Sequence, residues 1–222
     1  MTDELPRGGR TRHRRLPEHG RYDREEMRAI LRAGFVCHLG VIVDGHPMVV
    51  PTVYGLDETA DTMFLHGSVA SRSLTTGAAE ICVTVTHVDG LVLARSVFEH
   101  GVNYRAVMVY GVPRVLTDPE EKLAGLRRLS EHTVPGQWAY VRLPNRKELA
   151  ATTILELPLA EASVKIRCGP PDDGDGPDRE LPVWAGVLPL TATWGEPVPD
   201  PALPDDRPVP AHIASRAGHR LG

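Results

Sequence analysis

Two β-rich runs flank the dipeptide Asp44-Gly45, and this pattern constrains the fold more than any other part of the chain. The runs read FVCHLGVIV and HPMVVPTVY. Both are rich in the β-branched and aromatic residues that strands favour, and Asp-Gly readily adopts the left-handed backbone of a two-residue hairpin turn. The pattern therefore predicts an antiparallel hairpin. Short strands joined by tight turns favour an antiparallel barrel or sandwich over alternating βαβ units.

Further β-rich runs raise the expected total to six to eight strands. Two of them, residues 81–88 and 91–98, flank Asp89-Gly90 and predict a second hairpin of the same kind. The other candidates are residues 62–66, 152–159, 162–168 and 181–190, the last with Trp184 buried as an aromatic core residue. Apolar residues make up 41% of the chain, which is enough for a sizeable core.

The stretch FEHGVNYRAVMVYG, residues 98–111, places polar residues just before an apolar strand. The strand is expected from Ala106 to Tyr110, in a longer run to about Leu116. A polar cluster at that point indicates either the cap of a sheet edge or a face turned toward a ligand. The lead-in residues concerned are His100, Asn103, Tyr104 and Arg105.

Helices are expected to be few and short. Asp23 is a good N-cap for residues 24–33, with Glu26 completing a capping box. Asp118 followed by Pro119 starts a second helix, and Asn145 with Glu148 opens a third. The interpretation is one domain over residues 21–195, with a flexible arm at 1–20 and a Pro-rich C-terminal tail at 196–222.

Several function classes are disfavoured by composition and motif. The formal net charge of −4 gives no support for nucleic-acid binding, and no apolar run approaches the ~20 residues that cross a bilayer, so no membrane partner is expected. Three widely spaced cysteines without a signal peptide favour a cytoplasmic location. No metal-binding spacing is present, and no catalytic residue can be assigned; His66 and His100 are the only candidates for a proton donor.

The segment HGSVASR indicates a phosphate site. A strand ending at Gly67-Ser68 leads into an expected short helix with Ser71 and Arg72 in or near its first turn. Unpaired N–H groups at a helix start, two hydroxyls and a guanidinium together suit a phosphate. The alternative interpretation is a capped helix that carries a surface arginine.

Taken in order, these motifs resemble the pyridoxamine 5′-phosphate oxidase-like flavoproteins, and within them the flavin-nucleotide-binding and nitroimidazole-resistance-related branch. The resemblance covers roughly residues 14 to 195 and rests on MVVPTVYG, LHGSVASR, THVDGLVLARSVFEHGVNYRAVMVYG and PVWAGVLPL. It implies a mainly β protein, a six-stranded antiparallel split barrel that works as a homodimer with FMN in a groove at the dimer interface. It also implies an FMN-dependent oxidoreductase that acts on an unidentified small molecule.

The resemblance implies a role for twelve residues in holding the cofactor. The flavin ring would be bordered by Val49, Val50, Pro51 and Thr52. The phosphate end would be held by His66, Ser68, Ser71 and Arg72, with Asn103, Tyr104 and Arg105 facing the ribityl-phosphate. Trp184 would come from the partner subunit and cover part of the site.

The match departs from the family pattern in one place. The pattern reads HSMNYRSV where this chain reads HGVNYRAV, so hydroxyls are missing at Gly101 and Ala106. Each charge-assisted hydrogen bond lost from a phosphate costs about 1.5–3 kcal/mol. Three alternatives therefore stay open: haem in place of flavin, the deazaflavin F420, or a non-catalytic flavin-binding or sensing module.

Overall fold

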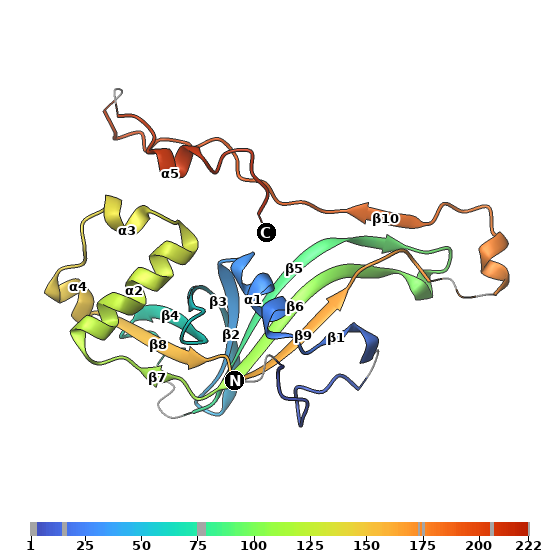
Figure 1. The fold of residues 1–222 in the computed structure, drawn as a ribbon, viewed down its shortest axis with the longest axis horizontal. Coiled ribbons are helices and arrows are strands. Elements are labelled where there is room, and N and C mark those ends of the chain that lie inside the picture. Colours follow the sequence, from blue (N-terminus) through green and yellow to red (C-terminus); the bar gives the residue numbers. More distant parts are fainter. Residues whose placement is uncertain are drawn as a thin grey trace.

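The structure, a computed structural model, describes residues 4–14, 17–74, 79–172, 174, 176–204 and 207–221. Its strands form one antiparallel sheet in the order β1-β9-β6-β5-β2-β3-β4-β8-β7, with β10 paired to β5. The path is open at both ends, so the sheet curls without closing (Figure 1). The prediction of a mainly β, antiparallel fold of the split-barrel kind with few short helices is confirmed.

The strands and helices have the following bounds. The strands are β1 (Gly20–Arg21), β2 (Val36–Val43), β3 (His46–Asp57), β4 (Thr62–Ser68), β5 (Ile81–Leu93), β6 (Gly101–Gly111), β7 (Arg114–Val115), β8 (Thr152–Pro158), β9 (Glu161–Arg167) and β10 (Gly186–Pro189). The α-helices are α1 (Arg24–Arg32), α2 (Pro119–Thr133), α3 (Gln137–Tyr140), α4 (Arg146–Ala150) and α5 (Ala211–Ala214). Short 3₁₀ turns lie at Pro17–His19, Val97–Glu99 and Pro177–Glu180.

The first Asp-Gly hairpin is formed as predicted. Val43 pairs with His46 across a turn in which Asp44 and Gly45 have φ angles of 52° and 80°. Both values lie in the left-handed region that a type I′ turn requires, which Asp and Gly tolerate better than other residues. This hairpin fixes the register of β2 and β3 in the middle of the sheet.

The second predicted hairpin, at Asp89-Gly90, is wrong. The chain does not turn there: β5 continues through both residues, and its pairing with β6 shifts register between Val88 and Gly90. Close packing explains the difference, because a Cβ added at Gly90 would lie 2.7 Å from the carbonyl oxygen of Leu188 on β10. Asp89 points instead to Arg105 on β6, with Arg105 Nε and an Nη 3.0 Å and 2.9 Å from the two carboxylate oxygens. The dipeptide forms a bulge in a long strand.

The stretch 98–111 also differs from its prediction. The strand begins at Gly101 and ends at Gly111, so Asn103, Tyr104 and Arg105 lie inside β6 rather than before it. Their backbone pairs with β5 on one side, and Tyr104 and Arg105 pair with β9 on the other. β6 is therefore an interior strand, and this polar cluster does not cap a sheet edge.

The helix predictions hold where capping is local. Asp23 accepts hydrogen bonds from the backbone N–H groups of Glu25 and Glu26, and Asp118 caps α2 in the same way. The return bond that Glu26 would supply to complete the predicted capping box is not among the hydrogen bonds described for α1. Asn145 and Glu148 form a full capping box at α4. The short helix expected at Ser71 does not begin there, because residues 69–74 form turns; residues 75–78 lie outside the described residues.

A continuous apolar core fills the curled sheet and the inner face of α1. Its fully buried members include Met27, Leu31, Leu39, Tyr54 and Leu65. A smaller cluster lies on the other face of β4 and β8, where α2 packs; its buried residues are Phe64, Leu116, Leu129 and Ile154. Figure 1 shows α2, α3 and α4 gathered over that end of the sheet. The helical layer therefore packs on the sheet through a second, smaller core.

Both ends of the chain contact the rest of the protein where they are described. Leu5 is buried in the main core, and Arg10 forms ion pairs with Glu80 and Glu161. The tail beyond residue 195 returns to the segment before it. The backbone N–H of Trp194 donates to the carbonyl oxygen of His219, and the N–H of Gly218 donates to the carbonyl oxygen of Trp194. The domain boundaries at residues 20 and 195 stay a prediction. Within the described residues, no helix is long and apolar enough to cross a membrane.

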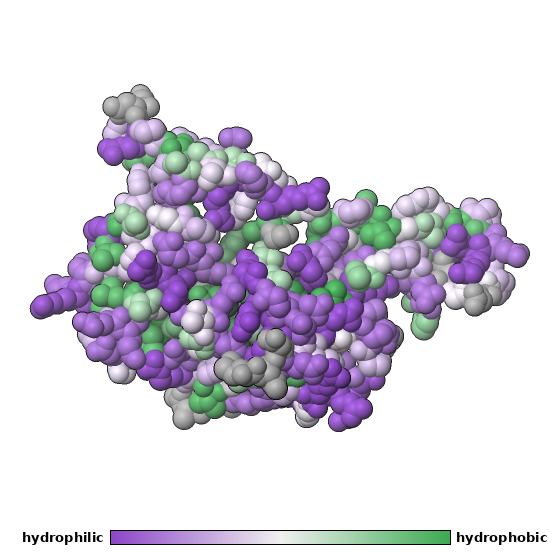
Figure 2. Space-filling view, in the orientation of Figure 1, coloured by the Kyte–Doolittle hydropathy of each residue, from purple (hydrophilic) through white to green (hydrophobic). Residues whose placement is uncertain are grey.

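β5, β6 and β10 extend beyond the rest of the sheet as an arm, at the right of Figure 1. Figure 2 shows apolar residues gathered along this arm among polar ones. Exposed apolar side chains on or beside these strands are Val88, Leu91, Met108, Trp184 and Leu188. Trp184 is 67% exposed, so its predicted burial in an apolar strand is wrong for the single chain.

Candidate functional site

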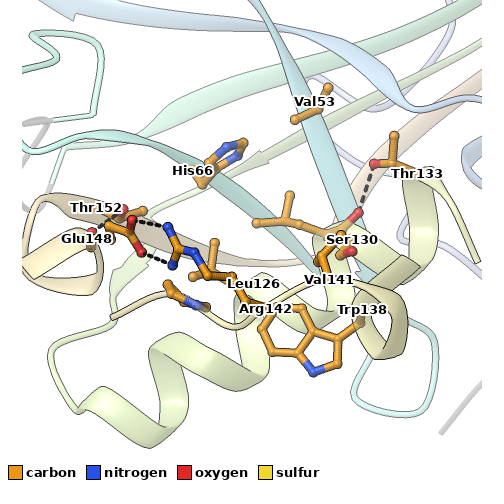
Figure 3. Close-up of a pocket in the computed structure, with 12 residues that line it drawn as sticks. Val53, His66, Leu126, Ser130, Thr133, Trp138, Val141, Arg142, Glu148 and Thr152 are labelled. Atoms are coloured by element: carbon orange, nitrogen blue, oxygen red, sulfur yellow. Dashed lines mark hydrogen bonds and ion pairs between the residues drawn. The ribbon is translucent and has the colours of Figure 1, made fainter. Parts of the chain in front are cut away.

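A cavity of about 570 Å³ lies between the helical layer and the sheet (Figure 3). That volume is within the range of sites that bind small molecules and cofactors. Its wall is mostly apolar, and its lining residues are Val53, His66, Leu126, Leu129, Ser130, Thr133, Trp138, Val141, Arg142, Pro144, Glu148 and Thr152. They come from β3, β4, α2, β8 and the segment that contains α3 and α4.

His66 is the one histidine on this wall. It lies near the end of β4, two residues after Phe64, so strand alternation turns both side chains toward the helical layer. Nδ1 of His66 is buried and has no hydrogen-bond partner among the described residues. Burial lowers the pKa of the ring below its usual 6.5, which favours the neutral imidazole. Because Nδ1 is buried, Nε2 is the atom of this neutral ring that is suited to bind a metal centre in the cavity.

One acidic side chain fixes the turn between α2 and α3. Glu131, on α2, accepts hydrogen bonds from the backbone N–H groups of Gly136 (2.8 Å) and Trp138 (3.0 Å). Gly136 has a φ angle of 87°, so the chain reverses sharply there and starts α3. Trp138 is thereby brought over the cavity.

The predicted flavin-ring residues lie on β3, away from the cavity. Val49 is 65% exposed, Pro51 is exposed, and Val50 and Thr52 are half-buried. Val50 packs against the main core. The cavity receives only Val53 from this strand.

The structure places the predicted phosphate-binding residues in different surroundings. His66 lines the cavity, whereas Ser68 is exposed and its hydroxyl accepts a hydrogen bond from Ala70. The hydroxyl oxygens of Ser71 and Ser73 lie 3.0 Å apart, and Arg72 forms an ion pair with Asp44 at the hairpin turn. Without a helix start at Ser71, the predicted helix N–H groups are not present at that point.

On β6, Asn103 and Arg105 already have partners within the chain. The amide of Asn103 donates to the carbonyl of Gly169 and accepts from Arg167, both at 3.0 Å. Arg105 is paired with Asp89, and Tyr104 is half-buried beside it. Gly101 gives space to Arg167: an added Cβ would lie 3.1 Å from its guanidinium carbon. A serine at this position would crowd that arginine.

The sequence did not indicate the helical wall of the cavity. Arg142 and Trp138 were not candidates, and Glu148 was recognised only as a helix-capping residue. A useful signal was present in QWAYVR, an apolar and aromatic segment with one arginine directly after Pro135-Gly136. The segment becomes part of the cavity wall only because α2 brings it to the same cavity as His66.

Solved structures share this fold. Flavocytochrome Anf3 from Azotobacter vinelandii is 37% identical, with a TM-score of 0.89 over 96% of this chain and 100% of that chain. An FAD- and haem-binding protein from Mycobacterium smegmatis is 34% identical, with a TM-score of 0.85 over 91% of this chain and 98% of that chain. A candidate 5-nitroimidazole antibiotic resistance protein from Bacteroides thetaiotaomicron is 19% identical, with a TM-score of 0.55 over 66% and 86%, and shows the fold alone.

No curated protein matches the chain. The family model for pyridoxamine 5′-phosphate oxidase matches residues 23–166, which is more than half of the 222 residues. This match, together with the two structures above 30% identity, confirms the predicted family and its split-barrel fold. The chain belongs to the pyridoxamine 5′-phosphate oxidase family.

Proposed function

We propose that this protein binds both a flavin and haem and acts as an oxidoreductase on a small molecule. The observation that carries the haem assignment is His66, a desolvated imidazole on the wall of the 570 Å³ apolar cavity, whose Nε2 would face a ligand because its Nδ1 is buried. Two similar structures support it: one is a flavocytochrome, and the other binds FAD and haem. The sequence left haem open as a replacement for the flavin; we propose it instead as a second cofactor, because one similar structure is an FAD- and haem-binding protein.

The residues of the cavity fit a porphyrin. Haem iron is commonly held by a neutral histidine, which His66 would supply. Leu126, Leu129 and Trp138 offer apolar and aromatic surface for a flat macrocycle and keep water from it. Bound haem would supply one-electron or dioxygen chemistry, while the chain's own side chains hold and orient it.

The flavin site needs a second copy of the chain. The predicted flavin residues on β3 and those on β6 are separated within one chain by β2 and β5. Trp184 is also exposed beside the arm. We therefore propose a homodimer in which β3 of one protomer and the arm of its partner enclose the flavin. Exposed apolar residues such as Val49, Leu91 and Met108 suit such an interface.

The test is the visible spectrum of the purified protein, before and after replacement of His66. We expect a Soret band from haem together with the visible absorption of a flavin. His66→Ala should remove the Soret band and keep the flavin absorption, and His46→Ala, at the exposed hairpin, should change neither. A Soret band that survives His66→Ala would contradict the haem assignment.

The identity and use of the flavin need two further measurements. Mass spectrometry of the released chromophore distinguishes FMN, which the resemblance predicts, from FAD and from F420. Anaerobic addition of NADH or NADPH, followed by a small-molecule acceptor, tests the oxidoreductase assignment. Bound cofactors that are never reduced would favour a binding or sensing module.

A further inference from the structure

The cavity wall has one permanently cationic side chain, Arg142, and one carboxylate, Glu148. All other lining residues are apolar, hydroxyl-bearing or, in the case of His66, held neutral by burial. An apolar cavity with a single arginine at its edge is suited to a flat apolar ligand that ends in a carboxylate. We propose that Arg142 is the carboxylate anchor of this cavity and binds a propionate of the haem; this rests on the haem assignment above.

The structure holds Arg142 in a defined position. Its two Nη atoms lie 2.8 Å and 2.6 Å from the two carboxylate oxygens of Glu148, a bidentate pair drawn in Figure 3. Glu148 is itself fixed, because the backbone N–H of Asn145 donates to its Oε2 at 2.8 Å in the capping box of α4. The guanidinium is therefore oriented before any ligand arrives, which lowers the entropic cost of binding.

The remaining donors of Arg142 are available to a ligand. The pair with Glu148 uses one N–H from each Nη, and Nη1 also donates to the carbonyl oxygen of Leu143 at 3.2 Å. Of the five N–H groups of a guanidinium, this leaves that of Nε and one on Nη2 for a ligand. The side chain of Arg142 is 72% exposed, so its unused face is open. In Figure 3 the pair lies at one side of the pocket, with His66 above it and Trp138 on the far side.

The charge of Glu148 selects for a carboxylate over a phosphate. Hydrogen bonds from Arg142 and from the backbone of Asn145 lower its pKa to about 2, so it stays ionised at neutral pH. A monoanionic carboxylate can share the arginine with Glu148, whereas a phosphate monoester would bring close to two negative charges beside it. The phosphate of a flavin nucleotide is thus a poor match for this position.

The experiment compares haem with haem dimethyl ester, in which both carboxylates are blocked. Spectral titration of cofactor-depleted protein should give roughly tenfold weaker binding of the ester than of haem, the loss of one charge-assisted hydrogen bond. Arg142→Gln should weaken haem binding by a similar factor and leave ester binding unchanged, and Arg142→Lys should restore part of it. Arg146→Gln, on the exposed face of α4, is the matched control and should bind both ligands as the wild type does.

The outcomes separate this inference from the proposed function. Equal affinity of the wild type for haem and ester would overturn the anchor while leaving a haem protein, and this comparison needs no variant to fold. If Arg142→Gln lowered the affinity for haem and for the ester by the same factor, Arg142 would have only a structural role in the cavity wall, and the anchor would be overturned. Failure of the wild type to bind either ligand would overturn the haem assignment itself.

Discussion

Gly55 on β3 packs directly against the backbone of Leu129 on α2. A Cβ added at Gly55 would lie 2.5 Å from the Leu129 nitrogen, closer than real Cβ contacts come. α2 can therefore approach the sheet this closely only because residue 55 has no side chain. Leu129 also lines the 570 Å³ cavity, so this contact fixes the depth of the proposed site.

Gly55→Ala should push α2 away from the sheet and weaken both stability and haem binding. Overpacking of this kind typically costs about 1–3 kcal/mol. Urea unfolding measures the first effect and haem titration the second. Gly195→Ala is the control, because an added Cβ there has no neighbour within 4 Å. An unchanged urea midpoint in Gly55→Ala would show that the contact is looser than described.

Neutralising Asp61 should lower the free energy of unfolding. It is 8% exposed and accepts from Arg24 at 2.5 Å and from Arg28 at 3.0 Å, which ties α1 to the turn before β4. Asp61→Asn keeps the shape and tolerates the φ angle of 54°. It removes the counter-charge of Arg24 and leaves Arg28 with only its 4.0 Å pair to Glu25. Breaking such a buried pair costs about 3 kcal/mol in unfolding free energy.

The same neutralisation at an exposed pair provides the comparison for Asp61. Glu4 and Arg7 have side chains 68% and 59% exposed, and Glu4→Gln should change stability by less than ~1 kcal/mol. Chemical denaturation of both variants measures the contrast. Similar losses at the two positions would mean that burial does not strengthen the Asp61 cluster.

Stability should fall as the pH is lowered from 7 to 5, in part through His132. Burial lowers its pKa below the usual 6.5, although its hydrogen bond to the Gly34 carbonyl opposes the shift. The unfolded chain therefore takes up a proton at higher pH than the folded one, so the stabilisation is present above about pH 6.5 and is lost below it. His132→Gln keeps a donor for Gly34 but cannot titrate.

Urea midpoints at pH 7 and pH 5 test this prediction. The wild type should lose more stability between the two values than His132→Gln does. His66 shifts in the same direction, so the variant should keep a residual pH dependence. An identical change in both proteins would exclude His132 as a source.

The C-terminal tail should slow the release of haem. His212 is hydrogen-bonded to Gln137 at 2.8 Å, and its ring lies 5.3 Å from that of Tyr140, so the tail holds both ends of α3. Trp138, between them, covers the cavity. His212→Ala should raise the rate of haem transfer to excess apomyoglobin by roughly threefold to tenfold, the worth of one neutral hydrogen bond.

The control for the tail is His219→Ala, because this side chain is exposed and lies outside the α3 contact. Its transfer rate should match that of the wild type. Equal rates for His212→Ala and the wild type would mean that α3 keeps its position without the tail.

Local signals in the sequence were sufficient where one short segment decides its own conformation. The turn at Asp44-Gly45 and the caps at Asp23, Asp118 and Asn145 all formed as predicted, because each depends on backbone groups within a few residues. The order of these motifs was also enough to indicate the family and the antiparallel split-barrel fold.

Tertiary packing decided the rest. Asp89-Gly90 has the same residues as the first turn, but β10 and Arg105 keep it in an extended, bulged strand. The direction of His66 could not be read locally either, since its cavity is closed by helices more than fifty residues further along the chain. A sequence specifies such a site only through contacts between distant segments, which the folded chain alone brings together.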